Sequence, residues 1–142
     1  MPVSAALTRD EVMLCIQPGE HGSTFGGNPL GCMVAMTAVD VLESEGLYDN
    51  ALEMGAVLMN ELKNLPDEVV EVVRGRGLFC GVVIRETEHF NAWEVCMRLR
   101  DAGLLAKPTH GHIVRFTPPL VIDKLEMEEC TEIICKTISS FM

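Results

Sequence analysis

Positive charge and aromatic side chains are both scarce in this sequence. Lysine and arginine total 11 against 21 aspartate and glutamate residues, which gives a formal net charge of -10, and aromatic residues make up only 5% of the chain. Because nucleic-acid binding depends on basic contacts with phosphates, this balance argues against a nucleic-acid partner. The sequence also lacks an apolar run long enough to cross a membrane. We therefore expect neither a nucleic-acid partner nor a membrane association.

Cysteines with metal-ligand or redox spacing are also missing, although the chain has six cysteines. They are widely scattered and form no C-x-x-C pair, so they match neither a zinc site nor a dithiol redox site. His110 and His112 lie two residues apart, but no third and fourth ligand accompanies them, and we expect no metal centre. The cysteines are typical of packed, reduced thiols in a reducing compartment, with a disulfide framework as the alternative.

A targeting segment is absent as well. The first residues have neither the basic and apolar regions of a signal peptide nor an Arg-rich amphipathic leader. Any leader would lie upstream of Met1, so the mitochondrial matrix and the cytoplasm both stay open as the compartment of a soluble protein.

The sequence does contain enough apolar material for one packed core, with 48% hydrophobic residues in a chain of 142. Apolar periodicity predicts a self-contained domain over 46–142, in which we expect Trp93 to be a packing residue. Its predicted helices cover about 49–64, 91–103 and 123–141, and its predicted strands cover 69–73, 78–84, 104–107 and 113–116. This pattern indicates an α+β fold in which helices cover a small, mostly antiparallel sheet.

Residues 1–45 follow a different pattern. Residues 2–7 predict a short apolar strand, while Asn28 and Pro29 predict the start of a helix that ends at Gly46. A strand without partners cannot satisfy its backbone groups. We therefore interpret residues 1–45 as a piece of a larger domain, joined by this helix to the domain at 46–142.

The densest motif is the run Gly-Glu-His-Gly-Ser-Thr-Phe-Gly-Gly-Asn-Pro-Leu-Gly at 19–31. Its glycines permit positive φ and close approach of a ligand, and Ser23 and Thr24 offer hydroxyls just before the positive end of a helix dipole. Such a loop suits an anionic group, phosphate above all. A tight structural turn before a helix is the alternative.

Arg115 is the second residue that could carry function. It lies in the otherwise apolar run at 112–119, His-Ile-Val-Arg-Phe-Thr-Pro-Pro, where a charge is costly unless it is paired. The sequence alone allows two explanations, a partner aspartate or glutamate and a bound anionic ligand.

These motifs together resemble those of class III, pyridoxal-phosphate-dependent aminotransferases, and the resemblance covers essentially the whole chain. The matching segments are Pro-Val-Ser-Ala at 2–5, Pro-Gly-Glu-His-Gly at 18–22, the loop that follows it, Arg-Gly-Arg-Gly-Leu at 74–78, Gly-Leu-Leu-Ala-Lys-Pro-Thr-His at 103–110, and Val-Arg-Phe-Thr-Pro-Pro-Leu at 114–120. Family subunits are much longer, and this chain resembles their C-terminal third. The resemblance thus implies the small domain of a fold-type I transferase at 46–142, preceded at 1–45 by part of the large, cofactor-binding domain.

The resemblance also implies site residues. Arg115 would clamp the substrate α-carboxylate, and Thr24, with Ser23 beside it, would reach across a homodimer to the phosphate of the neighbouring subunit's pyridoxal 5'-phosphate. The family's Schiff-base lysine precedes the Pro-Val-Ser-Ala segment and would lie upstream of Met1, so no catalytic residue is assigned. Lys107 belongs to a matching segment, but we assign it no role. We expect the isolated chain to be inactive.

Three functions stay open at this point. The phrase at 103–110 favours a family member that transfers the δ-amino group of ornithine to 2-oxoglutarate. Family members that act on acetylornithine or 4-aminobutyrate are the alternative within the enzyme class. A truncated, non-catalytic paralogue that acts as an interaction module is the alternative outside it.

Overall fold

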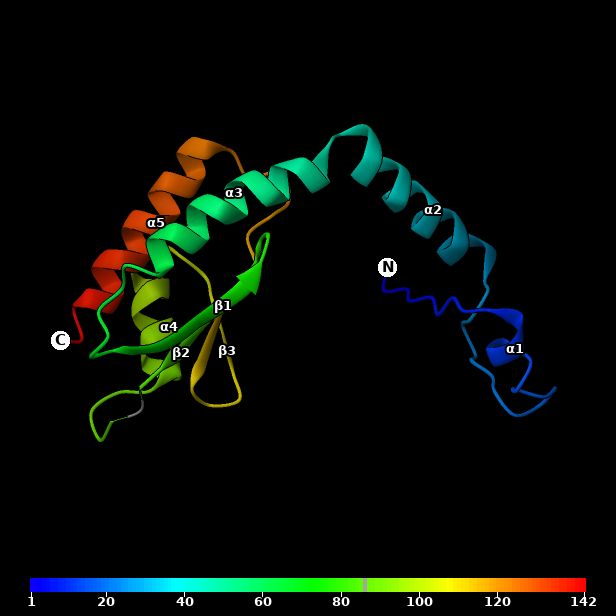
Figure 1. The fold of residues 1–142 in the computed structure, drawn as a ribbon, viewed down its shortest axis with the longest axis horizontal. Helices are drawn as coiled ribbons and strands as arrows, with labels where there is room; N and C mark the ends of the chain where they lie inside the picture. Colours follow the sequence, from blue (N-terminus) through cyan, green and yellow to red (C-terminus); the bar gives the residue numbers. More distant parts are fainter. Residues whose placement is uncertain (86) are drawn as a thin grey trace. The chain divides into compact units, whose positions relative to one another are not determined.

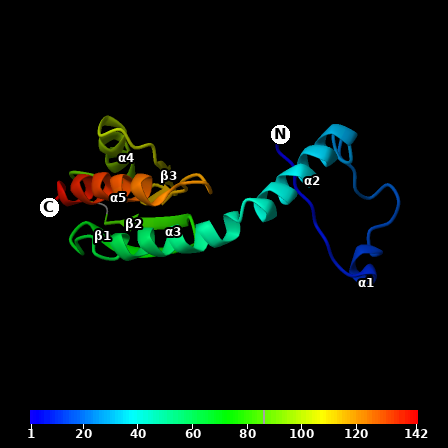
Figure 2. The ribbon, with the colours of Figure 1, turned by 90° about the horizontal axis from the view of Figure 1, so that it is seen from above.

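A computed structural model describes residues 1–85 and 87–142 of the chain. The chain divides into two compact units, Met1–Glu45 and Gly46–Met142, which we call unit 1 and unit 2. Figure 1 and Figure 2 show the elements of each unit from two directions.

Unit 1 contains the short helix α1 (Asp10–Met13) and the long helix α2 (Pro29–Ser44). Asn28 caps α2 as predicted, because its side-chain oxygen accepts a hydrogen bond of 2.7 Å from the Gly31 N–H. The strand predicted at 2–7 is wrong, since this segment is exposed and pairs with no other strand in the described part of the chain. A short apolar segment alone does not make a strand, because the backbone N–H and C=O groups need a neighbouring strand.

Unit 2 is built on a four-stranded antiparallel sheet with the order β1-β2-β4-β3. Its strands are β1 (Val70–Arg76), β2 (Phe79–Ile84), β3 (Lys107–Thr109) and β4 (Ile113–Phe116). The strands predicted at 69–73 and 78–84 pair as a hairpin, but the turn between them is shorter than the gap at 74–77 that their predicted bounds left. Arg74 and Arg76 pair with Gly81 and Phe79 of β2 and so belong to the strand, which leaves the turn to Gly77 and Leu78.

Three helices pack on one face of this sheet: α3 (Leu47–Leu62), α4 (Ala92–Asp101) and α5 (Lys124–Ser139). Asn91 and Asp123, the first residues of the helices predicted at 91–103 and 123–141, each form a capping box at the start of α4 and α5. α3 approaches the turn between β1 and β2 closely because Gly55 has no side chain; a Cβ atom there would lie 2.4 Å from the Gly77 backbone. The α+β fold predicted from the sequence is therefore confirmed.

Alternation along the strands divides the sheet into a core face and an open face. Cys80, Val82 and Ile84 of β2 are buried against the helices with Val114 and Phe116 of β4. The intervening residues of both strands therefore point to the other face. We expected Trp93 to be a packing residue, but it is 57% exposed on α4. The residues of α4 that are buried are Ala92, Val95, Cys96 and Leu99.

None of the helices in residues 1–85 and 87–142 combines the length and the apolar character that a membrane crossing requires. The same residues bring together no group of three or more His, Cys, Asp or Glu side chains that could hold a metal ion.

Candidate functional site

Arg115 lies on the open face of the sheet, in the middle of β4. Its cross-strand partners are Gly81 on β2 and Lys107 on β3. The side chain is half-buried, and its Nε is fully buried without a hydrogen-bond partner among the described residues. A buried N–H without an acceptor costs about 1–3 kcal/mol, so this atom calls for a partner that the described chain does not supply.

No aspartate or glutamate in the described part of the chain serves as that partner. The four ion pairs found there all lie on other residues, and none includes Arg115. Its guanidinium carbon lies 5.7 Å from the centre of the Phe79 ring, within the range of a cation–π contact. Phe79 is 60% exposed and therefore stabilises the guanidinium without covering it. Of the two explanations for Arg115, this geometry favours an anionic ligand.

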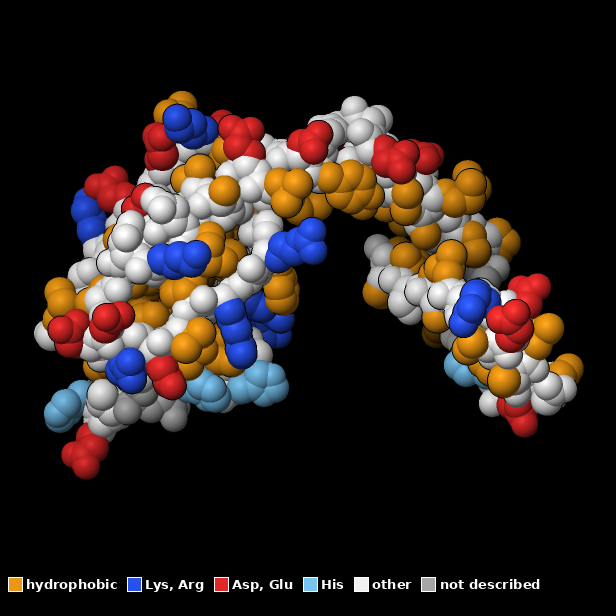
Figure 3. Space-filling model, in the orientation of Figure 1, with side chains coloured by type: hydrophobic (Ala, Val, Ile, Leu, Met, Phe, Trp, Pro, Cys, Tyr) orange, Lys and Arg blue, Asp and Glu red, His pale blue; other side chains and the backbone are white. Residues whose placement is uncertain are grey.

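Further cations share the open face with Arg115. Because directly paired residues point to the same face of a sheet, the register aligns Arg74, Gly81, Arg115 and Lys107 in one row across the four strands. The four strands contain four cationic residues and one carboxylate, Glu71, in a chain that is acidic overall. Figure 3 shows Lys and Arg side chains over the strands of unit 2. The sheet therefore carries a local concentration of positive charge.

The glycine-rich loop in unit 1 positions Ser23 and Thr24 in one turn. The Ser23 hydroxyl accepts a hydrogen bond of 3.1 Å from the Gly26 N–H and so closes the turn. Thr24 is exposed, and its hydroxyl makes no hydrogen bond within the described residues. A Cβ atom built at Gly22 or Gly27 would meet nothing within 4 Å, so the backbone there is open to a ligand. Thr24 thus fits a hydroxyl donor to a phosphate, whereas Ser23 also has a structural role.

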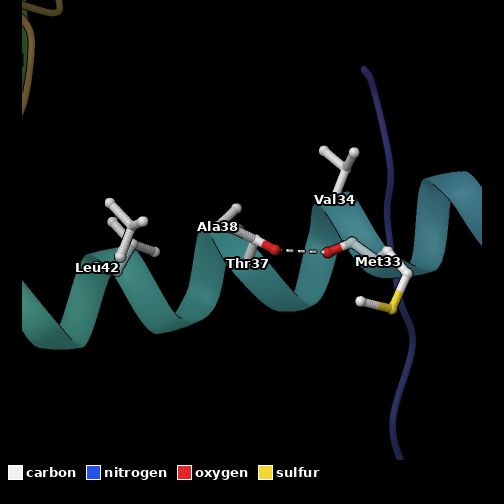
Figure 4. A pocket seen from close by; sticks show the side chains of 6 residues that line it. Met33, Val34, Thr37, Ala38 and Leu42 are labelled. Atoms are coloured by element: carbon white, nitrogen blue, oxygen red, sulfur yellow. Dashed lines mark hydrogen bonds between the residues drawn. The ribbon is translucent and has the colours of Figure 1, made fainter.

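Unit 1 also contains a pocket of 850 Å³ between its N-terminal segment, the loop and α2, and Ser23 lies in its wall. A second hollow of 530 Å³ follows one face of α2. Figure 4 shows that its only polar side chain, Thr37, donates a hydrogen bond of 3.0 Å to the Met33 carbonyl of the same helix. This apolar groove offers no ionisable group and is a packing surface rather than a reaction site.

Burial disfavours the thiolate form of the cysteines in unit 2, and the thiolate is the nucleophilic form. Burial raises the pKa of the Cys96 thiol to about 11 and also raises that of Cys80. The predicted packing of the cysteines is confirmed for unit 2, but Cys15 and Cys32 in unit 1 are exposed.

The structure therefore places the predicted site residues in two groups, Ser23 and Thr24 in unit 1 and Arg115 in unit 2. Sequence reasoning assigned no role to Lys107 or Phe79, because their neighbourhood with Arg115 depends on strand register. The run of matching motifs around Lys107 was the only signal that pointed to it.

Comparison with known proteins shows the family of this chain. A family model described as "Aminotransferase class-III" matches residues 1–138. Among curated proteins, the mitochondrial ornithine aminotransferase of Drosophila melanogaster is 62% identical over 139 residues, which cover 98% of this chain and 32% of the relative. The mitochondrial ornithine aminotransferase of Rattus norvegicus is 61% identical over 140 residues, or 99% of this chain and 32% of the relative.

Solved structures give the same result. The ornithine aminotransferase of Plasmodium yoelii is 41% identical with a TM-score of 0.86, over 96% of this chain and 36% of that chain. The acetylornithine aminotransferase of Elizabethkingia anophelis is 45% identical with a TM-score of 0.83, over 95% of this chain and 34% of that chain. The chain thus spans about a third of the length of the proteins it matches.

Proposed function

Because the chain belongs to the class-III aminotransferase family, we propose that it is the C-terminal part of an ornithine aminotransferase that uses pyridoxal 5'-phosphate. The complete enzyme would transfer the δ-amino group of ornithine to a 2-oxo acid such as 2-oxoglutarate and yield glutamate semialdehyde. In this proposal unit 2 is the small domain, and unit 1 is part of the large cofactor-binding domain. The identity of 62% to the Drosophila enzyme supports ornithine as the amino donor.

One observation within the molecule carries the proposal, namely the orphaned guanidinium of Arg115. A guanidinium can donate two parallel hydrogen bonds to a carboxylate, and every substrate of this reaction contains one. The buried, unpartnered Nε makes Arg115 better satisfied when a carboxylate is bound than when the site is empty. Arg115 would therefore bind and orient the substrate carboxylate.

Thr24, which lies in unit 1, would hold the cofactor. Its free hydroxyl can donate to a phosphate oxygen of pyridoxal 5'-phosphate in the neighbouring subunit of a homodimer, while Ser23 keeps the turn closed and lies beside it. When bound, this cofactor supplies the electron sink that amino-group exchange requires. The Drosophila and rat relatives are mitochondrial by name, which supports the mitochondrial matrix over the cytoplasm as the compartment.

The direct test is a chimaera in which residues 1–142 replace the matching third of the Drosophila enzyme. We expect the purified chimaera to retain the cofactor and to convert ornithine and 2-oxoglutarate. The intact Drosophila enzyme is the positive control, and the chimaera with Arg115→Ala is the negative control. A folded, cofactor-loaded chimaera without ornithine-dependent turnover would refute the proposal.

The likeness to the acetylornithine enzyme of Elizabethkingia anophelis makes acetylornithine the second candidate donor. A preference of the chimaera for acetylornithine over ornithine, expressed as kcat/KM, would favour that alternative. If the 142-residue chain binds full-length subunits but the chimaera shows no turnover, a non-catalytic interaction module would be favoured instead.

A further inference from the structure

We propose that Lys107 is a second cation of the carboxylate site at Arg115 and makes this site prefer the dicarboxylate 2-oxo acid over the amino-acid donor. This inference rests on the proposed function and adds a specificity-determining residue to it.

The position of Lys107 follows from the pairing of β3 with β4. Lys107 and Arg115 are direct cross-strand partners, so their side chains start from the same face of the sheet with Cα atoms about 4.5–5.5 Å apart. Like charges placed directly opposite each other destabilise a sheet. Within the described residues neither side chain has a carboxylate partner. A bound anion would remove this repulsion, because it can interact with both cations.

The two cations would approach a bound anion from different strands. The contact with Phe79 draws the Arg115 guanidinium toward β2, while Lys107 extends from β3 and is exposed. On that same strand and face, Thr109 has a buried hydroxyl without a hydrogen-bond partner. Thr109 Oγ1 and Arg115 Nε are the two buried side-chain polar atoms without a partner in residues 1–85 and 87–142. Both atoms lie on the open face: Arg115 is the cross-strand partner of Lys107, and Thr109 lies two residues after Lys107 on β3. The pair β3 and β4 is therefore the place where a polar ligand would satisfy both atoms.

The charges of the two substrates explain why a second cation would discriminate between them. The 2-oxo acid carries two carboxylates and no cation, whereas ornithine carries one carboxylate and two ammonium groups. An extra positive charge therefore attracts the dicarboxylate more strongly than it attracts ornithine. Arg115 alone recognises a carboxylate in both substrates and cannot provide this difference.

The experiment uses the full-length chimaera with Lys107→Gln and Lys107→Arg. For Lys107→Gln we expect the KM for 2-oxoglutarate to rise about tenfold, as for loss of one charge contact at a partly exposed site. The KM for ornithine should stay constant or fall, and kcat should change little. Lys107→Arg should restore the KM for 2-oxoglutarate. Lys63→Gln, an exposed lysine at the end of α3, is the matched control and should change neither KM.

Two further measurements separate this role from a structural one. Glutarate, a dicarboxylate that cannot react, should lose affinity in Lys107→Gln by the same factor when its binding is measured by calorimetry. The thermal midpoint should stay constant or rise, because a like-charge pair is removed. Unchanged glutarate affinity, or an equal rise of both KM values, would overturn the inference. Calorimetry requires no turnover, so its result is independent of whether the chimaera is an ornithine aminotransferase.

Discussion

Replacing Arg115 by methionine tests most directly whether this residue serves the fold or a ligand. Methionine keeps an unbranched apolar stem in β4 but removes the guanidinium. Loss of the buried, unpartnered Nε should stabilise the fold by about 1–3 kcal/mol. Loss of the contact with Phe79 should destabilise it by about 0.5–1 kcal/mol. We therefore expect the free energy of unfolding to stay unchanged or to rise by up to about 2 kcal/mol.

The effect on function should be opposite and larger. If Arg115 donates two charge-assisted hydrogen bonds to the substrate carboxylate, each contributes about 1.5–3 kcal/mol, and kcat/KM in the chimaera should fall by at least about a hundredfold. Arg115→Lys should recover only part of this loss, because an ammonium cannot form the bidentate contact.

Two assays provide these numbers. Urea denaturation of the 142-residue chain compares the stability of Arg115→Met with that of the unmodified chain, and steady-state kinetics of the chimaera give kcat/KM for ornithine and 2-oxoglutarate. A loss of stability of more than about 1 kcal/mol, without a separate kinetic defect in the folded chimaera, would refute our reasoning and show that Arg115 serves the fold.

Four other predictions follow from the same structure. Thr24→Ala should weaken cofactor retention in the chimaera by about 1–3 kcal/mol, measured by dialysis, while Thr24→Ser should preserve it. Gly55→Ala should destabilise the chain by about 1–3 kcal/mol in urea denaturation despite the better helix propensity of alanine, because the new Cβ would lie 2.4 Å from backbone atoms; unchanged stability would contradict this packing. Burial holds the pKa of Cys96 at about 11 in the folded chain, above the ordinary 9.0. The contribution of the protonated Cys96 thiol to the free energy of unfolding should therefore be complete below pH 9 and decrease as the pH rises from 9 to about 11. Cys96→Ala should abolish this part of the pH dependence of unfolding. The 142-residue chain alone should show no ornithine-dependent turnover and no borohydride-trapped cofactor on a specific lysine; observing both would contradict our expectation that the isolated chain is inactive.

The sequence by itself determined the local features of this protein. The caps at Asn28, Asn91 and Asp123 were predictable because a cap joins a side chain to a backbone group only two or three residues away. The buried stripe of α4 was predictable because helical periodicity relates residues three and four positions apart. The α+β fold and the family followed from such local patterns and from the motifs at 19–31 and 112–119.

Only the tertiary structure decided the properties that depend on residues far apart in the chain. It showed that residues 2–7 have no partner strand in the described chain and that Trp93 is exposed, since both outcomes depend on what packs nearby. It also left Arg115 without an ion pair among the described residues and placed Lys107 opposite it. The reason is physical: strand register is selected by the packing of the whole sheet against its helices, and register determines which charges share a face.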